Sequence, residues 1–584
     1  MNIKKMITLC LLAVLVAFAC LEQIPTHAAG EVASGKCGEN VTWKLDEAGT
    51  LTISGSGPMT DWQTTNAAPW FDKENWHYMH VVMVVIKNGV TTVGANAFSY
   101  CDSIQKVVLP KSVTVIGDSA FQSIFGLEEV QVNAKLTTIG PYAFADCHNL
   151  TAFTIPNTVT SIGDSAFNGC RALEEIVIPD AVTEFGTYAF AFCNSLRSVT
   201  LPSTMTRIPG AMFKGCESLA AVQIPESVTV IEAEAFSDCS SLTDVELPAG
   251  ITEIANDVFF RCAALTKMNI PDGVTSIGFS AFGSCTSLAQ ITIPGSVTVI
   301  GEQAFQDCVS LSEISIPESV TVIGDSAFQG CVGLTHVTIP NSVTRIGTWL
   351  FNDCVWLEEV VLSENLTVIP YYAFGNCTAL QSIHIPDGVN RIDDSAFRGC
   401  ALLGAIWIPA SVTEIRNDAF ADCFLMYHVL YLGTQEEWNT IRIWEGNAAL
   451  TDVMRHYECV GDEELYSELK RCSACCAKGN HEFEVMETLP TCTSDGSIVS
   501  SCVYCDETVT EVIPATGHSF GQWSVVKEPS HWEAGQEQRV CPCGETEERE
   551  IPKLKGLPPV LIVAAVVILA GAAVAVVILR KKRG

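Results

Sequence analysis

Apolar and polar positions follow one pattern over most of this chain, and the pattern returns every 23 residues without a slip. A phenylalanine stands at the same place in each copy, at Phe98, Phe121, Phe144, Phe167, Phe190, Phe213, Phe236, Phe259, Phe282, Phe305, Phe328, Phe351, Phe374, Phe397 and Phe420. A period between about 20 and 29 residues is typical of a solenoid, in which each unit buries its apolar face only against its neighbours. The pattern therefore predicts a β-rich solenoid of about fifteen coils over residues 90–432.

The first half of each coil predicts a short strand. In one copy this strand covers residues 311–316. Because strand side chains alternate between two faces, Ile314 and Ile316 are expected to point inward and Ser315 outward. Pro317 ends the strand, since it has no N–H to donate to a ladder. Stacked copies of this strand predict a continuous parallel sheet.

The second half of the coil predicts another strand and a compact connection. Residues 320–323 alternate again between apolar and polar side chains, which indicates a second short strand. Gly324 follows and allows a tight turn. A tight helical or 3₁₀ segment is then expected to start at Ala327 and Phe328.

The repeated pattern C-x-x-L-x-x-I-x-I-P-x-S-V-T-x-I-G-x-x-A-F resembles the bacterial surface-antigen leucine-rich repeats of BspA type. The phenylalanine is present in every copy, and the cysteine in all but one, where Ile124 replaces it. Proline follows the strand except at Asn133, Ser363 and Leu432. The resemblance covers residues 90–432. Members of this family are typically cell-surface proteins implicated in adhesion to host matrix or to other cells, so the resemblance implies such a role here.

Most of the cysteines belong to the repeat. Cys101 and the cysteines found every 23 residues from Cys147 to Cys423 occupy one position of the coil. Stacking places them about 4.8 Å apart, but equivalent coils give parallel Cβ directions, which are wrong for disulfides. The slot lies between Phe and Leu positions and suits a small apolar group. We therefore expect a column of buried, free thiols.

The segments on either side of the coils predict caps. Residues 41–45 and 51–54 alternate around a turn and indicate a β-hairpin. Trp62, Trp70 and Trp76 add aromatic bulk, either as the core of an N-terminal cap or as a carbohydrate-binding surface. After the last coil, the repeat decays into a segment that resembles the terminal cap of the same family.

The two ends of the chain predict export and a membrane anchor. Two lysines, an apolar run and small residues near position 28 read as a signal peptide. Residues 557–579 carry no charge and are long enough to span a bilayer. Four basic residues follow at once, which is typical of a cytoplasmic flank. The expected parts are a signal peptide (1–28), an N-terminal β-rich cap (29–89), the leucine-rich repeat solenoid (90–432), a C-terminal cap (433–455), small Cys/His-rich modules that form a stalk (456–556), a single transmembrane helix (557–579) and a cytoplasmic basic tail (580–584).

The Cys/His-rich modules contain a second internal repeat. Proline, glycine, cysteine and histidine residues of 481–514 align with those of 518–552, and His531 stands where Cys492 stands in the first copy. Zinc accepts either residue as a ligand, whereas a disulfide requires cysteine at both ends. Two structural zinc sites are the prediction, with disulfides or free thiols as equal alternatives. The expected ligands are His481, Cys492, Cys502 and Cys505 in one module, and His518, His531, Cys541 and Cys543 in the other.

Charge and motifs narrow the function. The chain has a formal net charge of −33, which opposes binding to nucleic acid and anionic lipid. It carries no phosphate-binding loop, dinucleotide fingerprint, H-E-x-x-H motif or EF-hand loop. The sequence thus predicts no enzyme and no required cofactor, and a polysaccharide-active enzyme built on the N-terminal tryptophans is a distant third reading.

The sequence therefore predicts a membrane-anchored surface binding protein, an adhesin whose repeat surface recognises an extracellular protein or glycan. The alternative is a structural spacer of the cell envelope without a specific ligand. A ligand site is expected where the outward strand column, mostly small and polar, changes to Val361, His384 and Trp407. The competing interpretation is that the C-terminal cap covers these three side chains.

Overall fold

The computed structural model describes the repeat region and parts of the modules, and it divides into two compact units. The first unit comprises Met1–Cys423 and Val429–Val453, and the second comprises Phe424–His428 and Met454–Gly584. The described residues are 31–72, 77–78, 80–426, 428–451, 453–457, 483–488, 490, 494–502, 508–515, 517, 519–530, 533–542 and 544–553. The predicted signal peptide, transmembrane helix and basic tail lie outside them. Within these ranges, no helix is long and apolar enough to cross a membrane.

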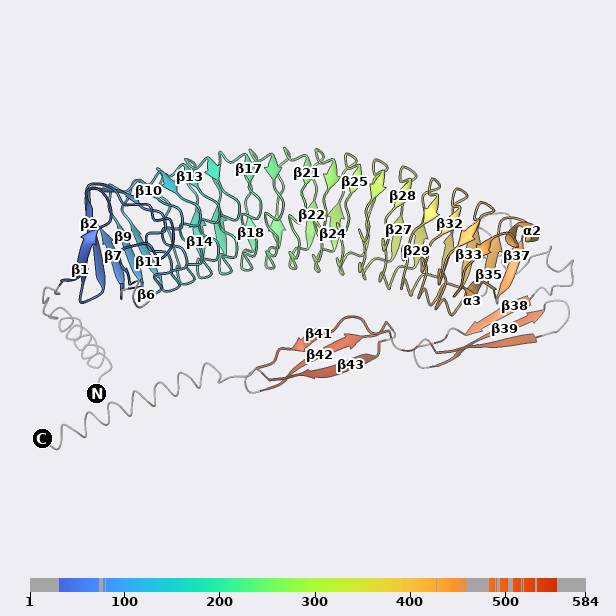
Figure 1. Ribbon diagram of the computed structural model, residues 1–584. Coiled ribbons are helices and arrows are strands. Elements are labelled where there is room, and N and C mark those ends of the chain that lie inside the picture. Colours follow the sequence, from blue (N-terminus) through green and yellow to red (C-terminus); the bar gives the residue numbers. More distant parts are fainter. Residues whose placement is uncertain are drawn as a thin grey trace, which may run out of the picture. The chain divides into compact units, whose positions relative to one another are not determined.

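The first unit is the predicted β-solenoid, whose coils follow one another in chain order (Figure 1). Most coils contribute one strand to each of two columns, and strands of successive coils pair in parallel within a column. The first column contains β7 (Met83–Ile86), β9 (Lys106–Leu109), β11 (Glu129–Val132), β14 (Glu175–Val177), β16 (Ser198–Thr200), β18 (Ala221–Val222), β20 (Asp244–Val245), β22 (Lys267–Asn269), β24 (Gln290–Thr292), β27 (His336–Thr338), β29 (Glu359–Val361), β31 (Ser382–His384), β33 (Ala405–Ile408) and β35 (His428–Tyr431).

The second column runs along the stack beside the first. It contains β4 (Gly57–Pro58), β8 (Val90–Val93), β10 (Val115–Ile116), β12 (Thr138–Ile139), β13 (Ser161–Ile162), β15 (Glu184–Phe185), β17 (Arg207–Ile208), β19 (Val230–Ile231), β21 (Glu253–Ile254), β23 (Ser276–Ile277), β25 (Val299–Ile300), β26 (Val322–Ile323), β28 (Arg345–Ile346), β30 (Val368–Ile369), β32 (Arg391–Ile392), β34 (Glu414–Ile415) and β36 (Arg442–Ile443).

The prediction of one continuous sheet is wrong. Strands of the first column form separate sets, among them β14 with β16, β18 with β20, β22 with β24 and β27 with β29. Most of these strands have only two or three residues before proline ends them, so each rung has few ladder hydrogen bonds. At residues 314–316 the isoleucines are buried and Ser315 is exposed, as predicted, although no strand is assigned there.

The predicted helical segment is also replaced by a different structure. The residues two before and two after each phenylalanine have positive φ, as at Gln303 (57°) and Asp307 (57°). Their amides, and that of the phenylalanine between them, donate to carbonyls of the next coil: Phe305 donates to Ala327 at 2.8 Å. The intervening amides donate within the coil, three residues back. Alternate residues thus face the neighbouring coil, and this turn face becomes a third ladder instead of a helix.

The core between these faces is a stack of phenylalanines beside a column of thiols. Successive rings lie nearly parallel, with centroids 5.1–6.0 Å apart. The cysteines from Cys101 to Cys423 are buried and free, as predicted. From Cys147 onward each thiol donates to the carbonyl of the phenylalanine 26 residues earlier, at 3.1–3.3 Å. Cysteine is therefore both a core filler and a weak donor between coils.

The S-V-T part of the consensus links coils through side chains. Ser319 Oγ donates to the carbonyl of Val297 at 2.6 Å. Thr321 Oγ1 donates to the carbonyl of Thr298 at 3.3 Å. The same bonds recur in other coils, for example from Ser342 to Val320. The serine hydroxyl satisfies a carbonyl that the short strands leave open, whereas the threonine hydroxyl shares its acceptor with the backbone amide of Thr321, which donates to Thr298 at 2.9 Å.

The N-terminal cap contains the predicted hairpin. It is formed by β2 (Val41–Asp46) and β3 (Thr50–Gly55), which are antiparallel, with β1 (Glu31–Lys36) at the outer edge of β2. β3 runs parallel to β7 and so joins the hairpin to the first strand column. A short pair, β5 (Phe71–Asp72) and β6 (His77–Tyr78), completes this region.

Trp70 ends the phenylalanine stack at the N-terminal cap. Its ring is fully buried and stacks on Phe98, with centroids 4.9 Å apart. Trp62 is half-buried against Trp70, and Trp76 lies outside the described residues. Trp70 is therefore core, and the carbohydrate-surface interpretation fails for it.

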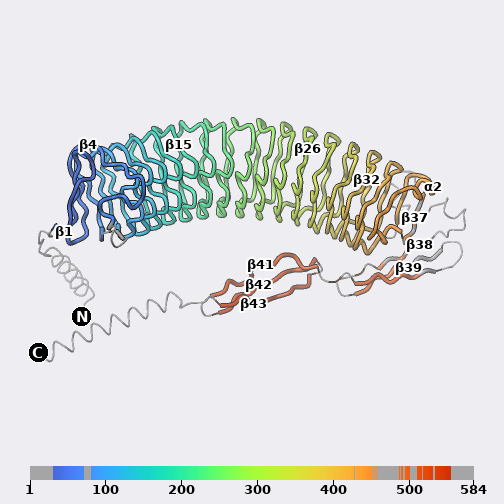
Figure 2. Tube along the Cα trace, viewed as in Figure 1, coloured from blue at the N-terminus to red at the C-terminus, as the bar shows by residue number. Residues whose placement is uncertain are grey.

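At the other end of the solenoid, two short helices follow the last coil. They are α2 (Gln435–Trp438), which starts with a capping box of Thr434 and Glu437, and α3 (Ala448–Thr451). Trp438 is buried against Tyr431, with ring centroids 5.2 Å apart. Figure 2 shows both ends of the coil stack.

The second unit contains two three-stranded antiparallel sheets, and the strand β37 (Met454–Tyr457). One sheet is β38 (Phe483–Thr488), β39 (Gly496–Cys502) and β40 (Thr508–Ile513), and the other is β41 (Ser524–Lys527), β42 (Gly535–Val540) and β43 (Thr546–Ile551). Gly496 and Gly535 are packed alike, because a Cβ on either would lie 2.4 or 2.5 Å from a proline nitrogen. The internal repeat predicted from the sequence is thus a repeated structure.

Candidate functional site

The outward column of the first strand face carries the predicted site. From Thr154 to His384 every residue of this column is exposed. His384 on β31 pairs directly with Trp407 on β33, and β29, which carries Val361, lies beside β31. Val361 is 47% exposed, His384 is exposed, and Trp407 is half-buried. The three side chains therefore share one face in adjacent coils, and the first two are open to solvent.

Two other tryptophans lie close in sequence but serve different faces. Trp349 occupies the positive-φ position before Phe351, on the turn face. Its ring stacks on that of Tyr372, with centroids 4.3 Å apart. Trp356 is exposed in the segment that leads to the strand. The structure thus places Trp349 apart from the strand-face column.

The predicted zinc ligands fall almost entirely outside the described residues. Only the side chain of Cys541 is described, and it is buried in a tight connection between β42 and β43. Its amide donates to the carbonyl of Glu545 at 2.8 Å. Among the residues that the structure describes, no cluster of three or more His, Cys, Asp or Glu side chains is arranged to hold a metal. Zinc in the modules stays a prediction.

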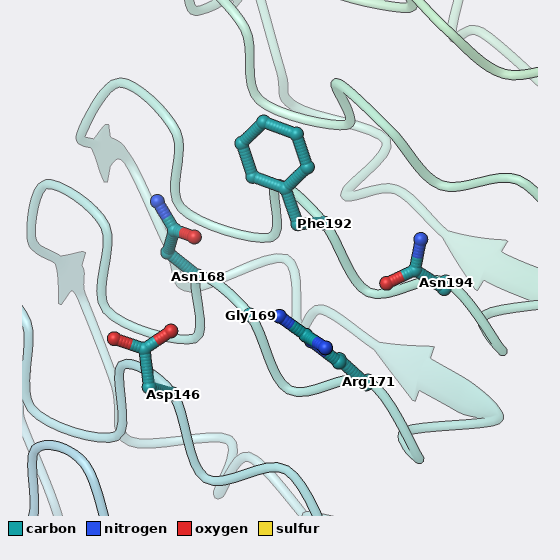
Figure 3. A pocket seen from close by; sticks show the side chains of 6 residues that line it. All are labelled: Asp146, Asn168, Gly169, Arg171, Phe192 and Asn194. Atoms are coloured by element: carbon teal, nitrogen blue, oxygen red, sulfur yellow. The ribbon is translucent and has the colours of Figure 1, made fainter.

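A hollow that the sequence did not suggest lies on the turn side of three consecutive coils (Figure 3). It encloses about 370 Å³ and is lined by Asp146, Asn168, Gly169, Arg171, Phe192 and Asn194. Phe192, 41% exposed, supplies an aromatic face in a position that most other coils give to Ser, Asp, Asn or Gly, with Tyr100 and Arg261 as the other large residues. That break in the column is the sequence signal which could have revealed the hollow.

Two glycines shape this hollow. A Cβ on Gly169 would lie 2.5 Å from Oδ1 of Asp146, so a side chain there would close the floor. A Cβ on Gly215 would lie 2.6 Å from the ring of Phe192, so glycine allows that ring to lie across the next coil. Both glycines also have positive φ, 73° and 70°, which other residues adopt at a cost.

The polar groups around the hollow carry both signs of charge. Among the described residues, Arg171 makes no ion pair, and its side chain is exposed. Asn194 Nδ2 donates to Oε1 of Glu217 at 2.8 Å. His148 stacks on Phe125 and lies 3.8 Å from Asp146, and its Nε2 is buried without a hydrogen-bond partner.

The buried thiols of the core have no nucleophilic role at neutral pH. Burial raises the pKa of Cys216 and of Cys285 to about 12. Burial raises the pKa of Cys262 well above its ordinary value in the same way, and the neighbouring thiol of Cys285 adds to the effect. These thiols therefore stay protonated, which excludes them as reactive cysteines.

Comparisons with known proteins agree on the repeat. Residues 72–197, 183–312 and 298–426 each match the family model of the BspA type Leucine rich repeat region (6 copies). No curated protein matches the chain. The solved structures with similar folds include a leucine-rich repeat protein from Bacteroides ovatus, at 26% identity and a TM-score of 0.52, with 72% of this chain and 98% of that chain covered.

Two further structures resemble the chain more loosely. A leucine rich cell surface protein from Faecalibacterium prausnitzii has 26% identity and a TM-score of 0.34, with 70% of this chain and 97% of that chain covered. A pneumococcal vaccine antigen has 16% identity and a TM-score of 0.41, with 73% and 99% covered. The family matches span more than half of the chain and coincide with the coils of the solenoid. The chain therefore belongs to the BspA type leucine-rich repeat family.

Proposed function

We propose that this protein is a cell-surface binding protein, an adhesin that recognises a host matrix protein, mucin or another cell through the strand face of its solenoid. The observation that carries the proposal is the run of Val361, His384 and Trp407 along adjacent coils. The rest of that column is mostly small and polar. Stacked repeats offer long recognition surfaces, and this repeat family favours binding over catalysis.

The composition of the three residues suits a protein ligand. Trp407 brings a large ring already held by its neighbours, so it loses little conformational freedom on binding. His384 adds a hydrogen-bonding ring beside it, and Val361 extends the apolar area to a third coil. Such rigid aromatic positions are enriched among residues that dominate interface energies.

Export by residues 1–28 and anchoring by residues 557–579 are part of the same proposal. A single membrane helix with a basic flank would hold the solenoid and the modules outside the cell. The acidic charge of the chain makes nucleic acid an unsuitable partner.

The test uses the predicted ectodomain, residues 29–556, immobilised and screened against matrix proteins, mucin and whole cells, with an equally acidic control protein. We expect saturable binding that Trp407→Ala and His384→Ala each weaken at least tenfold. Thr338→Ala, on the same column further along the stack, should leave binding unchanged. Binding that equals the acidic control favours the spacer. If Trp407→Ala lowers the melting temperature and leaves binding intact, Trp407 belongs to the core of the C-terminal cap.

A further inference from the structure

We propose that the hollow on the turn side of the coils at Phe144, Phe167 and Phe190 binds a neutral saccharide residue. This inference does not depend on the strand-face site of the proposed function, because it uses other residues on another side of the coils. Its observations are the built cavity, its mixed polar lining and its single exposed aromatic ring (Figure 3).

The shape of the hollow results from the turn geometry of three coils. Asp146, Gly169 and Phe192 occupy the same coil position, two residues after the phenylalanine, and all three have positive φ. The turn ladder holds their backbones, since each of their amides donates to a carbonyl of the next coil. The site is therefore formed before any ligand arrives. Its volume of about 370 Å³ lies at the small end of ligand pockets and suits one ring rather than a long chain.

The polar lining selects against ions. A carboxylate at Asp146, with Glu217 beside Asn194, disfavours an anion. The guanidinium of Arg171 disfavours a cation. The side-chain amide of Asn168 has donor and acceptor atoms, whereas Asn194, whose Nδ2 donates to Glu217 and to the carbonyl of Gly215, contributes its acceptor oxygen. A group that both donates and accepts satisfies such a mixed set, and hydroxyl groups do so without charge.

The aromatic ring specifies the shape of the partner. Phe192 offers a flat apolar face next to polar groups, and Gly215 lets its ring lie across the neighbouring coil. A sugar ring combines an apolar C–H face with hydroxyls around its edge, so it matches a ring on one side and amides on the other.

The chain provides a matched control for the floor of the hollow. Gly330 has the same positive φ, 69°, and a Cβ there would lie 2.3 Å from Oδ1 of Asp307, just as Gly169 lies above Asp146. The following coil, however, carries Asp353 where Phe192 stands, and Val332 replaces Arg171. Gly169→Ala and Gly330→Ala thus introduce the same strain, but only the first alters the hollow.

The experiment is saturation-transfer difference NMR on the full-length protein, kept in a detergent without a sugar head group. The probes are free D-galactose, D-mannose, L-fucose and N-acetyl-D-glucosamine, with N-acetylneuraminic acid and D-glucosamine as charged probes. We expect at least one neutral sugar to receive saturation, mainly on its C–H face. Gly169→Ala, Phe192→Ala and Arg171→Gln should each weaken this signal at least tenfold.

The controls are Gly330→Ala and Phe279→Ala, the second removing another exposed aromatic ring of the turn face, 39% exposed. Both should retain the signal, as should Phe192→Trp. The proposal is overturned if no neutral sugar gives a signal, if only the charged sugars do, or if the signal survives both Phe192→Ala and Arg171→Gln. A fold check by circular dichroism accompanies each variant, and Arg171→Gln, at an exposed side chain, keeps the test valid should a glycine variant unfold.

Discussion

The backbone amide of Phe420 donates a hydrogen bond of 3.0 Å to Oδ1 of Asn447. In interior coils the same amide donates to the alanine carbonyl of the next coil, as Phe397 does to Ala419. Asn447 thus supplies the acceptor that a missing sixteenth coil would have provided. Its Nδ2 in turn donates to the carbonyls of Arg416 and Trp444, at 2.7 and 3.0 Å.

Asn447→Leu should therefore loosen the last coil. The change leaves the buried amide of Phe420 without an acceptor, which costs about 1–3 kcal/mol. Because a solenoid is stabilised by nearest-neighbour interfaces, the loss should be local. Hydrogen exchange at the Phe420 amide should accelerate, while exchange at interior amides stays slow. Asn439→Leu, at an exposed position, is the control, and equal acceleration in both variants would contradict the capping role.

Trp70 closes the opposite, N-terminal end of the turn ladder. Its Nε1 donates to the carbonyl of Ala97 at 2.8 Å, the acceptor that interior coils offer to a phenylalanine amide. Trp70→Phe keeps an aromatic ring on Phe98 but removes the donor. We expect this change to lower the free energy of unfolding of the first coil by about 1–3 kcal/mol. Trp62→Phe, which alters a half-buried ring beside it, should cost less when both variants are compared by urea unfolding.

Whole coils should be removable. Deletion of residues 283–305 joins Phe282 to Gln306 and preserves the order of Phe, Cys and Leu along the core. The shortened protein should fold, with a sharp thermal transition. Deletion of residues 283–293 shifts every later side chain to another face and should abolish that transition. Equal unfolding by the two deletions, measured by circular dichroism, would contradict a solenoid stabilised by register.

The column of buried thiols predicts that the folded protein loses stability at alkaline pH. Burial raises the pKa of Cys216 and Cys285 from 9.0 to about 12. The folded protein therefore holds protons that the unfolded chain releases above pH 9, so stability is full below pH 9 and falls as pH rises toward 12. Each such thiol contributes a slope of up to about 1.4 kcal/mol per pH unit. Urea midpoints measured from pH 7 to 11 should fall steeply.

A variant with alanine at Cys216, Cys262 and Cys285 separates this effect from other titrations. It should be less stable at pH 7, because each substitution leaves a small void and removes a donor to a phenylalanine carbonyl. Its stability should nevertheless fall less steeply above pH 9. The same steepness in both proteins would show that the thiols do not govern alkaline unfolding.

The modules supply a test of zinc against disulfides. If His531 replaces Cys492 as a ligand, the ectodomain should contain about two zinc ions per chain after purification without chelators. His531→Ala should lower the metal content by one, measured by inductively coupled plasma mass spectrometry. His336→Ala, in the solenoid and outside the Cys/His-rich modules, is the control. A tryptic peptide in which Cys492 is bridged to Cys502 or Cys505 would establish the disulfide alternative.

The sequence alone determined the architecture of this protein. The fixed spacing of Phe, Cys, Leu and Ile sets which side chains meet in consecutive coils, because a one-residue slip would turn them to another face. The same spacing was sufficient to predict buried free thiols and the outward column that contains Val361 and His384. These features repeat, so each coil gives the same information again.

Only the tertiary structure decided what is not repeated or not local. It replaced the expected helix with turns whose alternate amides reach the next coil, because the acceptors lie 22 residues away and no local propensity reports them. It divided the predicted sheet into short ladders. It assigned Trp70 and Asn447 to the ends of the turn ladder, and it joined Asp146, Arg171 and Phe192 around one hollow. Those relationships depend on which coil lies beside which, and side chains from three coils meet there only after the chain has stacked.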